Sequence, residues 1–257
     1  MTSNQCILLS HVYIREKEEY KLDIVNYAVR HFRLHNPNTY IILTGHGLKP
    51  SNHNLVDYCY WQENIIEKEI NLGHPFLVNV GFDHALEKKF TKICKTRADS
   101  IHLIKNLVDF CEIILDNKKI LITQQTKLDD QEMGDLFLYG DLKFLKNCWN
   151  LSTWYPTSTG LKSLGNNFIN QHLNKNWISN LKSSCSFIDI YNLKWIDFRA
   201  NWHLLLDQKE NMMGNILPNF HEFLWGSNEN WHRFDEQGNL LGKNKKKYIT
   251  EKIWKNL

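Results

Sequence analysis

Glycine and proline are scarce in this sequence, with 12 and 5 residues among 257. This scarcity excludes a collagen-like or low-complexity chain, and a hydrophobic content of 42% is close to the globular norm. The sequence also lacks a large excess of charge of either sign, because it has 31 Lys and Arg residues and 28 Asp and Glu residues. A net charge of +3 without a basic stripe argues against a nucleic-acid partner. We therefore expect a folded protein that does not bind nucleic acid.

Long hydrophobic runs and closely paired cysteines are missing as well. No apolar run approaches the roughly 18 residues that cross a bilayer, and the N-terminal residues lack a signal-peptide pattern, so we expect a cytoplasmic protein. The six cysteines form no Cys-x-x-Cys pair, which disfavours a zinc ribbon or a redox dithiol and predicts mostly buried thiols. A short basic run at residues 243–247 is either a solvated loop or a peripheral contact with a membrane surface.

Strand-like and helix-like patterns alternate in the first half of the chain. Short apolar strands are expected at residues 6–13, 40–43, 56–61, 91–96 and 119–123. Amphipathic helices are expected at residues 22–32, 75–89, 104–115 and 142–149. A glycine-containing loop is expected at 44–47. Such alternation is typical of parallel βαβ units, whose ligands bind at the carboxyl ends of the strands. The sequence predicts an α/β fold with a mostly parallel central sheet flanked by helices.

The composition changes after about residue 148. Eight of the nine tryptophans lie in the last 109 residues, and the regular strand–helix pattern fades there. No long linker rich in Gly, Ser or Pro separates the two halves. We therefore expect residues 1–257 to form a single domain with an irregular, Trp-rich C-terminal half.

Two segments carry a resemblance to a known family. Residues 77–99 contain an Asn-x-Gly helix followed by a strand that ends in Lys-Thr-Arg-Ala-Asp, and residues 134–141 read Gly-Asp-Leu-Phe-Leu-Tyr-Gly-Asp. The first segment resembles the central signature of nucleotide-sugar glycosyltransferases with the GT-A fold, in which the strand ends in Asp-x-Asp. Both segments are similar to the WavE lipopolysaccharide-synthesis group, where a Lys-x-Arg-x-Asp form occurs. The resemblance covers roughly residues 5–150.

The resemblance implies a Rossmann-like GT-A enzyme that moves a sugar from a nucleotide-sugar donor to a saccharide or glycan acceptor, in the synthesis of a surface polysaccharide or glycan. Residues of about 5–125 would bind the donor, and about 126–257 would form the acceptor side. The family position of Asp99 implies a ligand for Mn²⁺ or Mg²⁺, hard cations that bind carboxylate and phosphate oxygens. Arg97 stands in place of the first acid, and it could pair with the donor phosphate or with Asp99.

Other polar residues around these motifs are candidates for contact with the donor. They are Ser10, His11, Thr44, Gly45, Asn79 and Lys95. Several have structural alternatives. Asn79 and Gly81 could permit close packing of a helix on the sheet, and Thr44 and Gly45 could belong to a plain loop.

Asp135 and Asp141 are the candidates for the general base that activates the acceptor hydroxyl. Asp141 could instead be the N-cap of the helix that follows it, and we favour Asp135 slightly. His203, His221 and His232 are possible third metal ligands, although packed or hydrogen-bonded histidines are the simpler interpretation. The aromatic residues of the second half, including Trp154-Tyr155-Pro156, could stack on sugar rings or fill a core.

Two rival functions remain open. A catalytically silent relative could bind carbohydrate or act as a scaffold, and the presence of Arg97 in place of an acid supports that alternative. A nucleotidyltransferase would also have a parallel sheet and metal-bound phosphates, but the sequence lacks a Gly-x-x-x-x-Gly-Lys phosphate loop.

Overall fold

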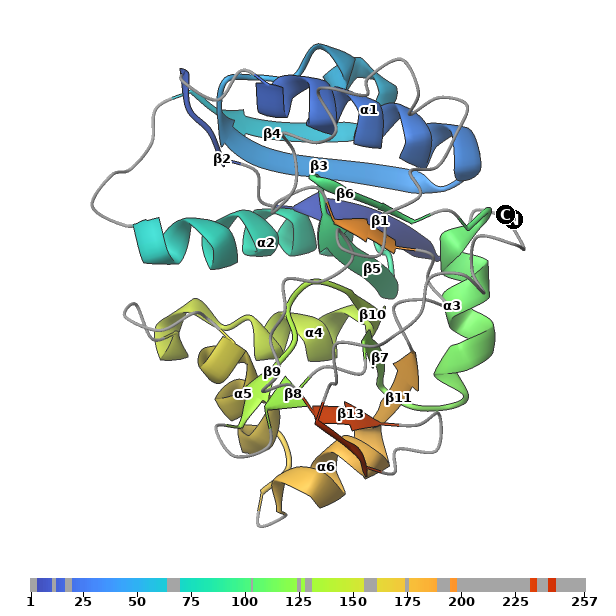
Figure 1. The fold of residues 1–257 in the computed structure, drawn as a ribbon, viewed down its shortest axis with the longest axis vertical. Helices are drawn as coiled ribbons and strands as arrows, with labels where there is room; N and C mark the ends of the chain where they lie inside the picture. Colours follow the sequence, from blue (N-terminus) through green and yellow to red (C-terminus); the bar gives the residue numbers. More distant parts are fainter. Residues whose placement is uncertain are drawn as a thin grey trace.

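The structure is a computed structural model (Figure 1), organised around one eight-stranded sheet. It describes residues 4–10, 13–16, 20–63, 70–102, 104–123, 126–127, 131–154, 161–173, 176–188, 195–197, 232–234 and 240–243. The strands of the sheet are β1 (Gln5–Ser10), β2 (Tyr13–Ile14), β3 (Tyr40–Gly47), β4 (Tyr58–Gln62), β5 (Lys92–Arg97), β7 (Ile120–Thr123), β10 (Leu138–Asp141) and β11 (Cys185–Ile188).

The sheet is mostly parallel. Its order is β11-β7-β10-β5-β1-β3-β2, with β4 also paired to β3. The pairs of β1 with β3, β1 with β5, β3 with β4 and β7 with β11 are parallel, whereas β10 runs antiparallel to both β5 and β7. The α/β fold with a mostly parallel central sheet is therefore confirmed. Strands from both sequence halves belong to this sheet, since β10 and β11 follow residue 126.

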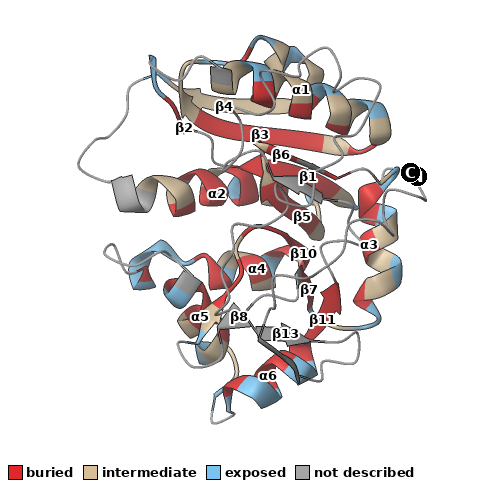
Figure 2. Ribbon diagram, viewed as in Figure 1, coloured by how far each residue is buried: buried red, intermediate tan, exposed pale blue. Residues whose placement is uncertain are grey.

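Helices cover both faces of the sheet. They are α1 (Tyr20–His35), α2 (Ile70–Glu87), α3 (Leu107–Leu115), α4 (Leu142–Cys148), α5 (Leu161–Asn170) and α6 (Trp177–Ser184). Side chains alternate along a strand, so Ile7 and Leu9 of β1 join a core with α1 and α3, while Cys6 and Leu8 join a second core with α2 and α4. Figure 2 shows buried residues along the central strands and on the inner faces of the helices.

Short elements complete the described structure. The 3-10 helices are η2 (Ser51–Leu55) and η4 (Leu151–Thr153). One small sheet pairs β6 (Ser100–His102) with β12 (Trp195–Asp197). A second small sheet has the strand order β14-β13-β8-β9 and consists of β14 (Leu240–Lys243), β13 (His232–Phe234), β8 (Thr126–Lys127) and β9 (Glu132–Met133).

The element boundaries differ from the sequence prediction in three places. The loop expected at 44–47 is wrong, because β3 continues to Gly47 while pairing with β2 and β4 on its two sides. Helix α2 begins at Ile70, so Pro75 lies inside the helix and not in its first turn. Regular structure also extends beyond residue 148, since α5, α6 and β11 occupy much of 161–188.

Tryptophans of the second half fill the core on the α2 side of the sheet. Trp149 is fully buried, and Trp154 and Trp177 are each 7% exposed. Trp149 and Trp154 stack with their ring centroids 5.0 Å apart. Core packing is therefore the structural role of these three residues.

Five of the six thiols are buried, at Cys6, Cys94, Cys111, Cys148 and Cys185, as expected from the sequence. Burial disfavours the charged thiolate, and it raises the pKa of Cys148 to about 12. Cys59 is half-buried, and its pKa is also raised by burial. These thiols behave as small apolar side chains.

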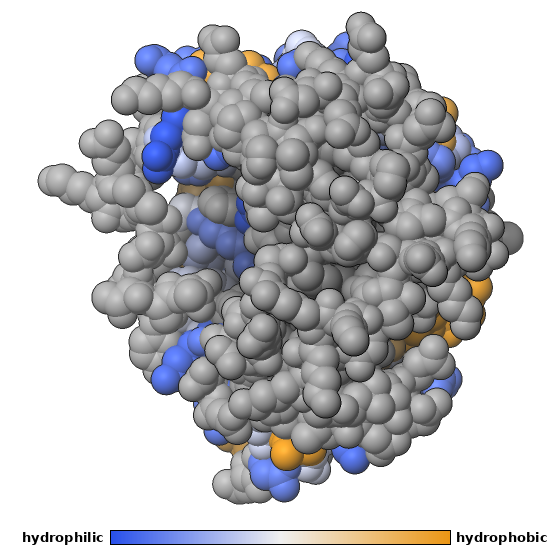
Figure 3. Space-filling model, in the orientation of Figure 1, coloured by the Kyte–Doolittle hydropathy of each residue, from blue (hydrophilic) through white to orange (hydrophobic). Residues whose placement is uncertain are grey.

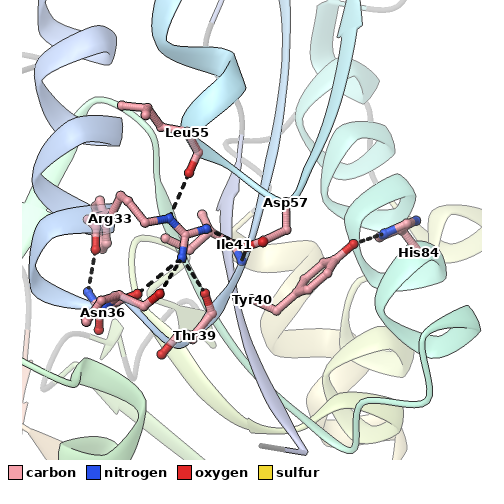
Figure 4. Close-up of polar contacts among 10 residues, drawn as sticks. Arg33, Asn36, Thr39, Tyr40, Ile41, Leu55, Asp57 and His84 are labelled. Carbon is pink, nitrogen blue, oxygen red and sulfur yellow. Dashed lines mark hydrogen bonds and ion pairs between the residues drawn. The ribbon is translucent and has the colours of Figure 1, made fainter. Parts of the chain in front are cut away.

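Arg33 fastens the end of α1 to the edge of the sheet (Figure 4). Its Nε donates to the carbonyl oxygen of Leu55 at 2.8 Å, and one terminal nitrogen donates to the carbonyl oxygen of Thr39 at 3.0 Å. The other terminal nitrogen donates to Asp57 Oδ2, which also accepts from the Ile41 backbone N–H at 2.8 Å. This network has a structural role away from the candidate site.

A histidine of α1 makes stability depend on pH. Burial and the neighbouring His35 lower the pKa of His31 from 6.5 to about 4. Because the unfolded chain binds this proton more readily, the free energy of unfolding falls as the pH decreases from about 6.5 to 4. We expect a loss of about 2 kcal/mol, allowing for partial exposure of the ring. Urea titrations at pH 7 and 4.5 should show a smaller difference for His31→Gln than for the wild type, and equal differences would contradict this account.

On the face drawn in Figure 3, the described residues are mostly hydrophilic, and the hydrophobic ones form small separate patches. In the described part of the chain, no helix combines the length and apolarity that a membrane span requires.

Candidate active site

Three predicted donor-binding residues lie side by side on β5, β1 and β3, level with the carboxyl ends of β5 and β1. Ser10 ends β1 and is in register with Arg97 at the end of β5. Leu9 is in register with Leu43, so Thr44 of β3 lies beside Ser10 on its other side. Alternation along the strands places all three side chains on the sheet face covered by α2. This is the carboxyl edge of the parallel strands, where α/β folds bind ligands.

The two hydroxyl groups in this row differ in their bonding. Ser10 is fully buried, and its Oγ donates to the carbonyl oxygen of Thr96 at 3.2 Å. Thr44 is also fully buried, but its hydroxyl makes no hydrogen bond with a described residue. Thr44 therefore has an unused donor and acceptor beside Ser10, whereas the Ser10 hydroxyl is bonded within the sheet.

Gly45 is explained by packing within the protein. A Cβ atom at this position would lie 2.3 Å from Cζ3 of Trp61, so the absence of a side chain makes room for the indole ring. The Trp61 ring nitrogen then donates to the carbonyl oxygen of Gly47 at 2.8 Å. Close approach of a tryptophan thus accounts for this glycine without a ligand.

Arg97 pairs with Asp99, one of the two alternatives that the sequence left open. Arg97 Nε donates to Asp99 Oδ1 at 2.8 Å, and a terminal nitrogen donates to Oδ2 at 2.7 Å. The two side chains are only 12% and 17% exposed. Both carboxylate oxygens of Asp99 therefore accept hydrogen bonds from a single guanidinium group.

The described residues do not fit a divalent cation at Asp99. A metal ion there would have to displace the guanidinium, which carries a like charge and already uses both oxygens. Within the described ranges, no group of three His, Cys, Asp or Glu side chains is arranged to hold a metal ion. We therefore derive no catalytic step through a metal.

Lys95 lies beneath the surface of the site. It is fully buried, its ammonium group donates to the backbone carbonyl oxygen of Asp135, and it lies 4.8 Å from the centre of the Trp149 ring. These contacts anchor the segment that carries Asp135 against β5. Lys95 thus connects β5 to the segment that carries Asp135.

Asp135 and Asp141 have different environments. Asp141 is the N-cap of α4, because its Oδ1 accepts from the Phe144 backbone N–H at 2.7 Å. The side chain of Asp135 is 16% exposed, and its Oδ2 lies 3.5 Å from Nδ1 of His74. The structural alternative considered for Asp141 is therefore present, whereas Asp135 forms a carboxylate–imidazole pair beside Lys95.

His74 is a member of the site that the sequence did not indicate. It lies in α2, with a side chain 17% exposed and its ring edge-to-face with Trp149 at a centroid distance of 5.0 Å. A lone histidine on an apolar helix has no diagnostic spacing. The sequence prediction begins this helix at residue 75. Because α2 begins at Ile70, residue 74 is helical, and its side chain faces Asp135.

Asn79 and Gly81 pack α2 onto its neighbours, which was the alternative considered for them. The Asn79 amide donates to the carbonyl oxygens of Trp149 at 2.7 Å and Pro75 at 2.8 Å. A Cβ atom on Gly81 would lie 2.4 Å from a methyl group of Leu8. Both residues therefore have structural partners that explain them.

Several predicted residues lie outside the described part of the chain. They are His11, Tyr155, Pro156, His203, His221 and residues 244–247. His232 belongs to β13, which the structure describes at the level of the backbone strand.

Comparisons with known proteins support the fold. No protein-family model matches the chain, and no curated protein sequence matches it. A solved mannosyltransferase from Pyrobaculum calidifontis, in complex with GDP-Man and Mn²⁺, is similar with a TM-score of 0.50 and 7% identity, over 87% of this chain and 68% of that one.

Two further structures have lower scores. One is described as a nucleotide-diphospho-sugar transferase from Desulfovibrio desulfuricans (TM-score 0.45, 9% identity, 82% of this chain and 97% of that one). The other is a 4-diphosphocytidyl-2C-methyl-D-erythritol synthase from Anaerococcus prevotii (TM-score 0.47, 9% identity, 81% and 97%). Together with the sheet order, the likeness to the mannosyltransferase shows that the chain has a GT-A type of α/β fold.

Proposed function

We propose that this protein is a glycosyltransferase that moves a sugar from a nucleotide-sugar donor to a saccharide acceptor, in the synthesis of a surface polysaccharide or glycan. The observation that carries the proposal is the row of Thr44, Ser10 and Arg97, level with the carboxyl ends of β1 and β5 and on the same face as Asp135. The GT-A fold and the mannosyltransferase with bound GDP-Man support a donor of this class. The resemblance of residues 77–99 and 134–141 to the WavE group supports the pathway.

In this proposal, residues from about 5 to 125 form the side of the protein that binds the donor. A nucleotide sugar carries about two negative charges on its diphosphate, and departure of the nucleotide requires positive charge where negative charge develops. Arg97 supplies a guanidinium at the end of β5, and the free hydroxyl of Thr44 supplies a hydrogen-bonding group two strands away. The residues after about 126 form the acceptor side, beginning with the segment that holds Asp135.

Asp135 is the general base in this proposal. Lys95 and Arg97 are two residues apart on the same strand face, about 7 Å along β5. Because Lys95 holds the backbone of Asp135, the carboxylate belongs to the same region as the guanidinium. His74 is a positioning residue, since its imidazole lies beside the Asp135 carboxylate. A carboxylate so placed can accept the proton of an attacking acceptor hydroxyl.

Nucleotide binding gives a direct test of the donor site. Thermal denaturation in the presence of GDP, UDP, CDP and ADP should show a higher melting temperature with at least one nucleotide. At a concentration of about 100 times the dissociation constant, the gain is roughly 2.7 kcal/mol. Arg97→Gln should lose this gain, whereas Lys143→Ala, which removes an exposed cation from α4, should keep it. No shift with any of the four nucleotides would contradict the proposed donor class.

A further inference from the structure

We infer that the Arg97–Asp99 pair replaces the divalent metal at the donor site, so that this enzyme binds the donor diphosphate without a metal ion. Arg97 is the group that contacts the diphosphate, and Asp99 is a positioning residue that fixes the guanidinium. The inference rests on the proposed function, because it concerns the same donor site.

The first observation is how Asp99 holds Arg97. Two parallel hydrogen bonds, at 2.8 and 2.7 Å, fix the plane of the guanidinium against the carboxylate. Such a bidentate pair sets orientation as well as charge. The Ser100 hydroxyl also donates to the Arg97 carbonyl oxygen at 3.1 Å, which ties the turn after β5 together. Asp99 thus orients a cation, which is the task that a metal-binding carboxylate performs for a metal ion.

The second observation is what remains free on Arg97. A guanidinium has five N–H donors, and the pair with Asp99 uses Nε and one terminal nitrogen. The other terminal nitrogen, Nη1, donates to no described residue. The side chain is 12% exposed, so part of it is accessible from solvent. Arg97 can therefore donate to phosphate oxygens while it stays paired with Asp99.

The third observation is a second cationic side chain on the same strand face. Lys95 is fully buried, and its side-chain nitrogen donates to the carbonyl oxygen of Asp135 and lies 4.8 Å from the centre of the Trp149 ring. A second cation near the end of β5 favours binding of a diphosphate.

Inorganic pyrophosphate and Mn²⁺, each used alone, separate the two ways of binding a diphosphate. Calorimetry in the presence of chelator should show that the wild type binds pyrophosphate. Arg97→Gln should bind it about 10- to 100-fold more weakly, since a charge-assisted contact is lost. Lys143→Ala is the matched control and should bind pyrophosphate as the wild type does. Electron paramagnetic resonance of Mn²⁺ should show no tight binding by the wild type.

Arg97→Asp recreates the Asp-x-Asp pattern and should invert both results. We expect this variant to bind Mn²⁺ and to lose pyrophosphate binding in chelator by at least about 10-fold. Circular dichroism checks that each variant is folded, and Arg97→Gln provides the test if Arg97→Asp does not fold. Failure of the wild type to bind pyrophosphate in chelator would overturn the inference, as would Mn²⁺ binding by the wild type that Asp99→Asn removes.

The inference and the proposed function fail in different ways. Sugar transfer that requires Mn²⁺ would keep the glycosyltransferase and overturn the metal-free donor site. Arg97-dependent pyrophosphate binding in chelator, together with absence of sugar transfer, would keep the metal-free anion site and contradict the glycosyltransferase.

Discussion

Asp135→Asn is expected to lower the rate of sugar transfer by about 100- to 10,000-fold, the usual contribution of a general base. Asparagine is close to aspartate in shape but cannot accept the acceptor proton as a carboxylate does. The backbone contact from Lys95 to residue 135 does not involve the replaced side chain, so the local structure should persist. Binding of the donor nucleotide should therefore remain close to that of the wild type. Initial rates of transfer and calorimetric nucleotide binding measure the two effects separately.

Asp141→Asn is the matched control for this experiment. Asp141 caps α4, and asparagine is about as good an N-cap as aspartate, so stability and rate should both stay near wild type. Asp141→Ala removes the cap and should cost about 1 kcal/mol of unfolding free energy with little change in rate. Normal transfer by Asp135→Asn, or an equal loss of transfer in Asp135→Asn and Asp141→Asn, would contradict the assignment of the base.

Gly140→Ala is expected to lower the free energy of unfolding by about 3 kcal/mol or more, because it combines backbone strain with steric overlap. Gly140 lies in β10 with φ at +152°, which side chains of L-residues rarely adopt. A Cβ atom there would lie 2.3 Å from the carbonyl oxygen of Lys119 and 2.8 Å from the Cα of Ile120. Strand β10 joins β5 to β7 at the middle of the sheet, so the overlap has little room to relax.

Gly73→Ala is the matched control for Gly140→Ala. Gly73 lies in α2, and an added Cβ would lie 3.8 Å from Cε1 of His46, an ordinary contact distance. Alanine favours a helix over glycine by about 1 kcal/mol, so this variant should be as stable as the wild type or more stable. Urea unfolding followed by circular dichroism compares the two variants. Similar midpoints for Gly140→Ala and the wild type would show that β10 tolerates a side chain at this position.

The fold was largely predictable because its central elements have clear local patterns. Short apolar runs marked β1, β5 and β7, and apolar residues at three- and four-residue spacing marked α1 and α3. The end of β3 was not predictable in this way. Glycines at 45 and 47 indicate a loop when taken locally, but pairing with β2 and β4 and packing of Trp61 keep them in the strand. Tertiary contacts of this kind leave no short-range pattern.

The candidate site was predictable only in part. Strand-end position was enough to bring Ser10 and Arg97 together, because parallel strands share one carboxyl edge. Thr44 was expected in a loop, and it lies beside Ser10 within β3. The sequence could not decide whether Arg97 pairs with a phosphate or with Asp99, since a guanidinium can form a bidentate pair with either anion. Two features depend on segments far apart in the chain: the burial of Lys95 under Trp149, and the pairing of His74 with Asp135. Those features required the assembled structure.

Release of nucleoside diphosphate from a panel of nucleotide sugars, measured with and without saccharide acceptors, tests the assignment of sugar transfer most directly. We expect the wild type to release the diphosphate from one class of donor, faster when an acceptor is present, and Asp135→Asn to lose the acceptor-dependent part. Mass spectrometry of the acceptor should show the added sugar. Absence of release from every donor, together with release of pyrophosphate from a nucleoside triphosphate and a sugar phosphate, would contradict sugar transfer and identify a nucleotidyltransferase.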